Sequence, residues 1–191
     1  DVFTRMADVD QDTAETHLAL GNLFRRRGEV DRAIHIHSSL IARTNLTDDQ
    51  RRRAMLELGE DYLRAGLFDR AEALFQELVD QPDHMEVALS RLIHILQQEK
   101  DWRQAIVYCD RLERIGGESK RRQTAHFCCE LAEEANSRNE PAEVKMWLLD
   151  ALARDPDCTR ANLLLGNLAM CAGDHQAAIL AFQAVERQDR G

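Results

Sequence analysis

The chain has 191 residues, of which 44% are hydrophobic, 5% aromatic and 31% charged, and its formal net charge is −9. The acidic excess argues against a nucleic-acid partner, because phosphate binding requires a clustered cationic surface. No run of alternating β-branched residues predicts strands, and no apolar run reaches the ~20 residues that span a bilayer. These properties predict a soluble all-α chain without a membrane segment.

One short pattern recurs along the chain at a fixed internal spacing. A glycine is followed seven residues later by a second glycine, and five residues after that by an alanine. The three full copies are Gly21, Gly28 and Ala33; Gly59, Gly66 and Ala71; and Gly166, Gly173 and Ala178. Two weaker copies keep the register with Leu92, Leu96, Lys100 and Ala105, and with Ala132, Ala135, Asn139 and Val144. The last position of each copy recurs after 38, 34, 39 and 34 residues. A 34-residue period with this signature is the tetratricopeptide pattern.

The pattern predicts pairs of helices in chain order. The expected helices are a partial one ending near residue 8, followed by pairs at 13–27 and 30–43, 48–65 and 68–80, 84–99 and 102–115, 119–138 and 141–154, and 158–172 and 175–188. Insertions are expected in the turns at 44–47 and 116–118, with Thr47 as a helix cap and Pro82 as a break. The expected fold is an all-α tetratricopeptide superhelix, or α-solenoid, of about five repeats plus a partial N-terminal helix. Residues 1–191 are expected to form a single array. Residues 1–10 are the end of a truncated repeat, and the full repeats cover 13–45, 48–82, 84–117, 119–156 and 158–191.

Each recurring residue type has a physical reason. A glycine inside a helix costs up to about 1 kcal/mol relative to alanine, so the first glycine is expected to admit a closely packed neighbouring helix. The second glycine falls where a left-handed residue ends a helix. Acidic residues that follow it, such as Asp101 and Asp174, are candidates for starting the next helix. The alanine gives the second helix a small contact surface against the first.

Both ends of the chain are expected to be truncated. Phe3 stands 34 residues before His37, in the slot that Phe75 and Phe182 occupy in their repeats. The chain is therefore predicted to begin inside a repeat, and any signal peptide or anchor of the parent protein is expected to lie outside these residues. Exposed apolar repeat edges would favour self-association.

Residues capable of chemistry have simpler explanations in this chain. The five cysteines form no Cys-x-x-Cys pair, and they suit small buried hydrophobic side chains in a reducing compartment. His126 and Cys129 lie one helical turn apart, but a zinc site needs four ligands, so no metal or other cofactor is expected. No Gly-rich phosphate loop, serine elbow or catalytic constellation is present. The sequence predicts that the chain is not an enzyme.

Function is expected in the groove lined by the first helix of each pair. Helical spacing from the glycines gives the predicted partner-binding residues, which are Asn22, Arg25, Arg26, Glu60, Arg64, His94 and Glu133. Leu18 and Cys129 are also expected to face this groove. Tetratricopeptide domains that bind the C-terminal tails of chaperones place a lysine one turn before an asparagine of the first repeat. Here Asn22 is present, but Leu18 holds the position of the lysine, so such a carboxylate clamp is not expected. The basic runs at 25–27, 51–53 and 120–122 are either solvated helix ends or contacts for an acidic partner.

A more specific resemblance lies in three stretches. The run GNLFRRRGEVDRAI at 21–34, with AGLFDRAE at 65–72 and AHFCCELA at 125–132, resembles the lipopolysaccharide assembly protein B family over nearly the whole chain. The resemblance implies a bacterial inner-membrane protein with an N-terminal anchor, a cytoplasmic repeat array and a C-terminal rubredoxin-like metal module. That module is built on two Cys-x-x-Cys pairs, which none of these cysteines matches, so its metal is expected outside this chain.

The resemblance also implies a role as an adaptor. Members of the family hold the committed-step deacetylase of the lipid A pathway near the membrane-bound AAA+ protease FtsH, so that turnover of the deacetylase limits lipopolysaccharide synthesis. Two alternatives stay open. One is a generic peptide-binding or assembly scaffold for other envelope proteins. The other is the regulatory arm of an enzyme, as in repeat-bearing glycosyltransferases. An upstream transmembrane segment and a downstream Cys-x-x-Cys pair in the full gene would favour the adaptor.

Overall fold

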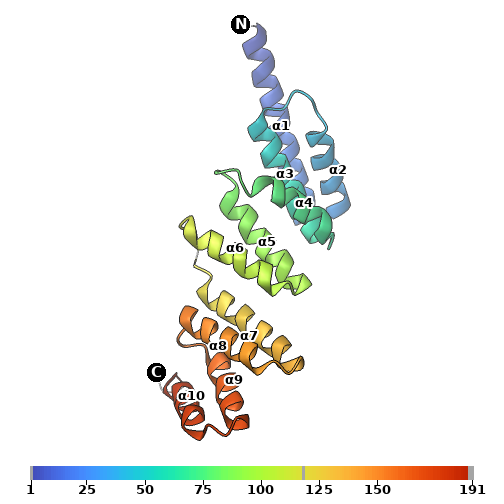
Figure 1. Ribbon diagram of the computed structural model, residues 1–191. Coiled ribbons are helices and arrows are strands. Elements are labelled where there is room, and N and C mark those ends of the chain that lie inside the picture. Colours follow the sequence, from blue (N-terminus) through green and yellow to red (C-terminus); the bar gives the residue numbers. More distant parts are fainter. Residues whose placement is uncertain (1, 118, 189–191) are drawn as a thin grey trace. The chain divides into compact units, whose positions relative to one another are not determined.

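The structure is a computed structural model that describes residues 2–117 and 119–188, with side chains for 13–117 and 119–185. The described residues fold into helices joined by turns, without a strand (Figure 1). The helices are α1 (Val2–Arg26), α2 (Val30–Ile41), α3 (Asp48–Arg64), α4 (Phe68–Leu78), α5 (Met85–Glu99), α6 (Trp102–Arg114), α7 (Arg121–Ser137), α8 (Pro141–Arg154), α9 (Thr159–Cys171) and α10 (His175–Gln188). Within the described ranges, no helix is both long enough and apolar enough to cross a bilayer.

The chain divides into two compact units, residues 1–95 and residues 96–191. In the first unit α1 packs on α2, α2 on α3 and α3 on α4, and α1 also contacts α3. In the second unit α6 packs on α7, α7 on α8, α8 on α9 and α9 on α10, and α7 also contacts α9. Packing of these helices on their neighbours in sequence is typical of stacked repeats. The all-α repeat fold expected from the sequence is confirmed.

The turn inside each helix pair has the same backbone geometry in all five copies. Gly28, Gly66 and Gly173 have positive φ angles of 81°, 73° and 76°. Lys100 and Asn139, which hold this position in the weaker copies, also have positive φ, at 61° and 59°. The next residue in each turn donates its N–H to the carbonyl five residues earlier, at 2.9 or 3.0 Å, as in a Schellman motif. The register predicted for the weaker copies is therefore confirmed.

The first glycine of each full copy allows one large side chain to approach the helix. The pairs are Gly21 with His37, Gly59 with Phe75, and Gly166 with Phe182. A Cβ atom added at these glycines would stand 2.3, 2.7 and 2.4 Å from the nearest ring atom, far inside van der Waals contact. The expected packing role of these glycines is confirmed, and His37 takes the slot that phenylalanine fills in the other two pairs.

The helix starts follow local capping chemistry. Thr47 and Gln50 form a reciprocal capping box at α3, in which the Thr47 hydroxyl accepts from the Gln50 N–H and the Gln50 side chain accepts from the Thr47 N–H. Asp101 and Asp174 cap α6 and α10 by accepting backbone N–H groups at 3.1 and 3.0 Å. The predicted cap at Thr47 is confirmed.

One predicted helix boundary is wrong. Helix α1 runs unbroken from Val2 to Arg26, so the separate partial helix expected to end near residue 8 does not exist. Residues 8–13 contain neither glycine nor proline, and nothing in them forces a helix to end. The repeat boundaries remain predictions. The expectation of exposed apolar edges rests partly on the side chain of Phe3, which lies outside the described residues, as do residue 118 of the second insertion and residues 189–191.

Candidate protein-binding site

A pocket of about 330 Å³ lies at the C-terminal ends of α1 and α3, beside α5. We call it the basic pocket; its lining residues are Arg25, Arg26, Glu60, Leu63, Arg64, Arg91 and His94. Five of the seven predicted partner-binding residues are among them. Helical spacing within each repeat therefore indicated side chains that the fold brings together from three helices. Arg91 was not predicted; the residue predicted on α5 was His94, about one helical turn further along.

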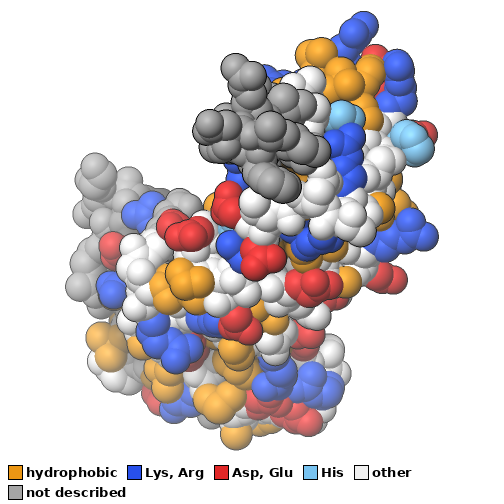
Figure 2. All heavy atoms as spheres, turned by 90° about the horizontal axis from the view of Figure 1, so that it is seen from above, with side chains coloured by type: hydrophobic (Ala, Val, Ile, Leu, Met, Phe, Trp, Pro, Cys, Tyr) orange, Lys and Arg blue, Asp and Glu red, His pale blue; other side chains and the backbone are white. Residues whose placement is uncertain are grey.

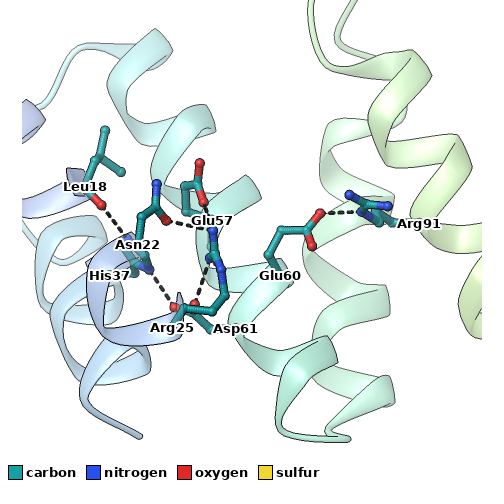
Figure 3. A network of polar contacts seen from close by, with 8 residues as sticks. All are labelled: Leu18, Asn22, Arg25, His37, Glu57, Glu60, Asp61 and Arg91. Carbon is teal, nitrogen blue, oxygen red and sulfur yellow. Dashed lines mark hydrogen bonds and ion pairs between the residues drawn. The ribbon is translucent and has the colours of Figure 1, made fainter. Parts of the chain in front are cut away.

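Arg25 is held in place by groups of α1 and α3 (Figure 3). Its guanidinium donates to Asn22 Oδ1 at 2.7 Å, Glu57 Oε2 at 2.5 Å and Asp61 Oδ1 at 2.8 Å. It also donates to the Glu57 carbonyl oxygen at 2.9 Å. Burial lowers the pKa of Arg25, but the hydrogen bonds to Glu57 and Asp61 outweigh burial and raise it. Arg25 therefore forms a fixed wall of the pocket, and Asn22 acts behind it rather than lining it.

The carboxylate of Asp61 connects Arg25 to the core of the first unit. Asp61 and His37 are both fully buried, and His37 Nδ1 lies 2.5 Å from Asp61 Oδ2. On the other side of the ring, His37 Nε2 lies 3.4 Å from the Leu18 carbonyl oxygen. A buried carboxylate requires such partners, because an unpaired charge in the interior is costly. The side chain that packs on Gly21 thus also supports the pocket wall.

The remaining charges of the basic pocket are unevenly compensated. Glu60 forms an ion pair with Arg91 (Figure 3). Arg26 and Arg64 are exposed, and neither makes an ion pair with any described residue. With Arg25 and Arg91 paired to carboxylates, these two guanidinium groups leave the pocket with excess positive charge. The arrangement can bind an anionic group.

A second pocket of about 420 Å³ lies between α7, α8 and α9 in the second unit. Its polar lining includes Glu133, Asn136 and Asn167, and its apolar lining includes Val144 and Leu168. Glu133, the seventh predicted residue, accepts from Arg160 at 2.8 Å, which compensates its charge. Amide groups around an apolar floor suit a peptide side chain and its backbone.

The repeat pattern is matched by a protein-family model. The model described as Tetratricopeptide repeat matches residues 18–86, 56–118 and 147–191. The chain belongs to the tetratricopeptide repeat family.

Two curated relatives give the more specific comparison. Lipopolysaccharide assembly protein B of Escherichia coli strain K12 is 40% identical over 190 residues, which is 100% of this chain and 49% of the relative. Lipopolysaccharide assembly protein B of Haemophilus influenzae is 39% identical over 92% of this chain and 44% of its own length.

The resemblance predicted from the three quoted stretches is therefore confirmed. The chain spans about half the length of the curated relatives it matches. Solved structures show the same tetratricopeptide fold. A crystal structure of MamA protein has a TM-score of 0.58 at 18% identity, covering 94% of this chain and 93% of that one. YrrB, described as a tetratricopeptide protein with an unusual peptide-binding site, has a TM-score of 0.57 at 15% identity, covering 97% of this chain and 91% of its own.

Two side chains of this tetratricopeptide chain that were expected to face the groove do not. Leu18 is 4% exposed and packs with Ala14, Leu40 and Ala54 in the core. Cys129 is fully buried. Both predictions are wrong because a side chain on the groove side of a first helix can be covered by the neighbouring helix when the repeats stack.

All five cysteines belong to the second unit, and most of them are buried. Three of them, Cys109, Cys128 and Cys129, are buried, whereas Cys158 is partly buried and Cys171 is exposed. Burial, together with the neighbouring Cys158 thiol 3.9 Å away, raises the pKa of Cys129 to about 12. Among the residues that the structure describes, no three histidine, cysteine or acidic side chains are placed to hold a metal ion. The expectation that all five thiols are buried is wrong for Cys171.

Charge on the surface is mixed rather than segregated. Figure 2 shows acidic and basic side chains interspersed over the visible face among the described residues. This agrees with a chain whose net charge is −9 and with many local ion pairs, such as those of Arg154 with Asp110 and Asp150. The basic pocket is therefore a local feature defined by its own unpaired arginines.

Proposed function

We propose that this chain is a non-catalytic scaffold that takes part in regulating lipopolysaccharide synthesis. In this proposal it binds the committed-step deacetylase of the lipid A pathway and brings it to the membrane protease FtsH. The observation that carries the proposal is the 40% identity to lipopolysaccharide assembly protein B over the full length of this chain. The relative's name and the tetratricopeptide fold both fit a role in protein interaction.

The mechanism requires no chemistry from the scaffold. A chain that holds a substrate protein and a protease together turns their encounter into a local event, and the gain is set by effective concentration rather than by new contacts between the two partners. The basic pocket supports this role, since two exposed arginines that form no ion pair with a described residue are available for contact. In the proposal, the chain acts on the cytoplasmic side of the bacterial inner membrane and carries no cofactor of its own.

The test is direct binding of this chain to purified lipid A deacetylase by isothermal titration calorimetry. Saturable binding is expected, and addition of the chain to deacetylase and FtsH should speed deacetylase degradation. The matched control is Gly66→Pro, which removes a positive φ of 73° and should disrupt the repeat turn. No saturable binding by a chain whose circular dichroism shows full helical content would refute the proposal. Binding to other envelope proteins instead would favour the generic scaffold.

A further inference from the structure

We infer that the basic pocket binds an acidic segment of a partner protein, and that Arg26 and Arg64 contact the side-chain carboxylates of that segment. The inference rests on the proposed function and adds the chemistry of the bound partner. It assigns different roles to the four arginines of the pocket: two hold its walls and two face the ligand.

The pairing of the arginines separates these roles. Arg25 is engaged by two carboxylates and an amide oxygen, and Arg91 is engaged by Glu60. Moving either guanidinium to a ligand would break existing charge-assisted hydrogen bonds, which are the strong kind. Arg26 and Arg64 can bind a carboxylate without breaking any ion pair to a described residue. They are the groups in the pocket that gain most from an added negative charge.

Helix electrostatics accounts for only part of this arrangement. Arg26 and Arg64 are the last residues of α1 and α3, where a cation complements the helix dipole by about 0.3–1 kcal/mol. That effect explains a basic residue at each helix end. It does not require the two ends to open onto one pocket, which also receives Arg91 and His94 from α5. The convergence of cations from three helices indicates a binding surface.

The shape and charge of the site favour a protein segment with acidic side chains. The planar guanidinium group matches a carboxylate through two parallel hydrogen bonds, and Leu63 gives the pocket an apolar contact for the methylene groups of glutamate. A polyanion such as nucleic acid would face a chain of net charge −9. Capture of a terminal carboxylate next to Asn22 is disfavoured, because Leu18 is buried in the position of the required lysine.

The probe is a fluorescein-labelled peptide of alternating glutamate and alanine, titrated with the chain and followed by fluorescence anisotropy. The same peptide with glutamine in place of glutamate is the ligand control. The chain should bind the glutamate peptide and not the glutamine peptide, and its affinity should fall as salt is raised. In Arg26→Glu/Arg64→Glu the affinity should fall by about tenfold or more, since two attractive pairs become repulsive.

The matched control variant is Arg52→Glu/Arg70→Glu, which makes the same change in net charge on α3 and α4 outside the pocket. It should bind the glutamate peptide within about twofold of the wild type. A peptide of alternating lysine and alanine provides a rescue test: Arg26→Glu/Arg64→Glu should bind it better than the wild type does. Recovery of binding with reversed charges would show direct contact and would exclude a folding defect.

Three results of the peptide and vesicle experiments would overturn the inference. The first is equal loss of binding in the two double variants, and the second is equal affinity for the glutamate and glutamine peptides. The third is binding of phosphatidylglycerol vesicles through Arg26 and Arg64 without binding of the glutamate peptide. The proposed function fails separately: lack of deacetylase binding by a chain that still binds the glutamate peptide refutes the adaptor role alone. Deacetylase binding that is unchanged in Arg26→Glu/Arg64→Glu refutes the inference alone.

Discussion

Replacing Asp61 with asparagine removes the buried negative charge behind the basic pocket while keeping the size of the side chain. Asp61 is fully buried and contacts Arg25 at 2.8 Å and His37 at 2.5 Å. A hydrogen bond to a charged group contributes about 1.5–3 kcal/mol and a neutral one about 0.5–1.5 kcal/mol. Asp61→Asn removes the charge from the bond to His37 and leaves the bond to Arg25 with one charged partner instead of two, so the change should cost about 2 kcal/mol in total. The side chain of Arg25 is 20% exposed, so water can hydrogen-bond to its guanidinium and offset part of this cost. The larger cost of breaking a fully buried ion pair is therefore not expected.

The assay must report on the first unit of the chain. Both tryptophans, Trp102 and Trp147, lie in the second unit, so tryptophan fluorescence would follow the wrong transition. Amide hydrogen exchange measured by mass spectrometry on peptides from α1 and α3 gives the local free energy of opening. The control is Glu57→Gln, which changes the more exposed partner of Arg25 and should cost less than about 1 kcal/mol. Equal losses in the two variants, or no loss in Asp61→Asn, would refute the reasoning.

Three other predictions follow from the second unit and from the helix packing. Gly59→Ala places a Cβ atom 2.7 Å from the Phe75 ring and should lower stability by about 1–3 kcal/mol in spite of its better helix propensity; thermal unfolding as in the wild type would contradict this. The hydrogen bond from Trp147, together with arginine partners, lowers the pKa of Glu143 from 4.5 to about 2. Its contribution to stability is therefore present above pH 4.5 and lost as the pH falls through about 2; an NMR titration midpoint near 4.5 for this carboxyl would contradict the prediction. Iodoacetamide should modify the exposed Cys171 before the buried thiols, and mass spectrometry that finds equal rates at all sites would show that these helices open readily.

The turn geometry could be predicted from the sequence because it is local. A left-handed residue is needed wherever a helix must end and reverse within a few residues, and the repeat spacing shows where that happens. Spacing alone placed Lys100 and Asn139 in this position although neither is glycine, and both have positive φ. The repeat period failed at α1, where it predicted a break although the intervening residues contain no local signal that ends a helix.

The polar network could not be predicted, because it depends on distances between repeats. Helical spacing gives the direction of a side chain on its own helix, and it correctly grouped Arg25, Glu60 and Arg64. It does not show that Arg25 reaches Asp61, which is 36 residues away in sequence, or that Glu60 reaches Arg91, 31 residues away. Such pairs form only when consecutive repeats stack. A partner residue such as Arg91 is therefore found only in the folded structure.

One sequence signal did mark this network, at the slot that packs on the first glycine of each repeat. Phenylalanine fills that slot against Gly59 and Gly166, whereas histidine fills it against Gly21. A buried ring nitrogen requires a hydrogen-bond partner, and the partner is Asp61, which in turn fixes Arg25 at the pocket wall. A phenylalanine at position 37 would pack on Gly21 equally well and would leave Asp61 with one partner fewer. The departure from the repeat pattern thus ties the core of the first unit to the orientation of a pocket residue, which a phenylalanine in that slot could not do because its ring has no hydrogen-bonding atom.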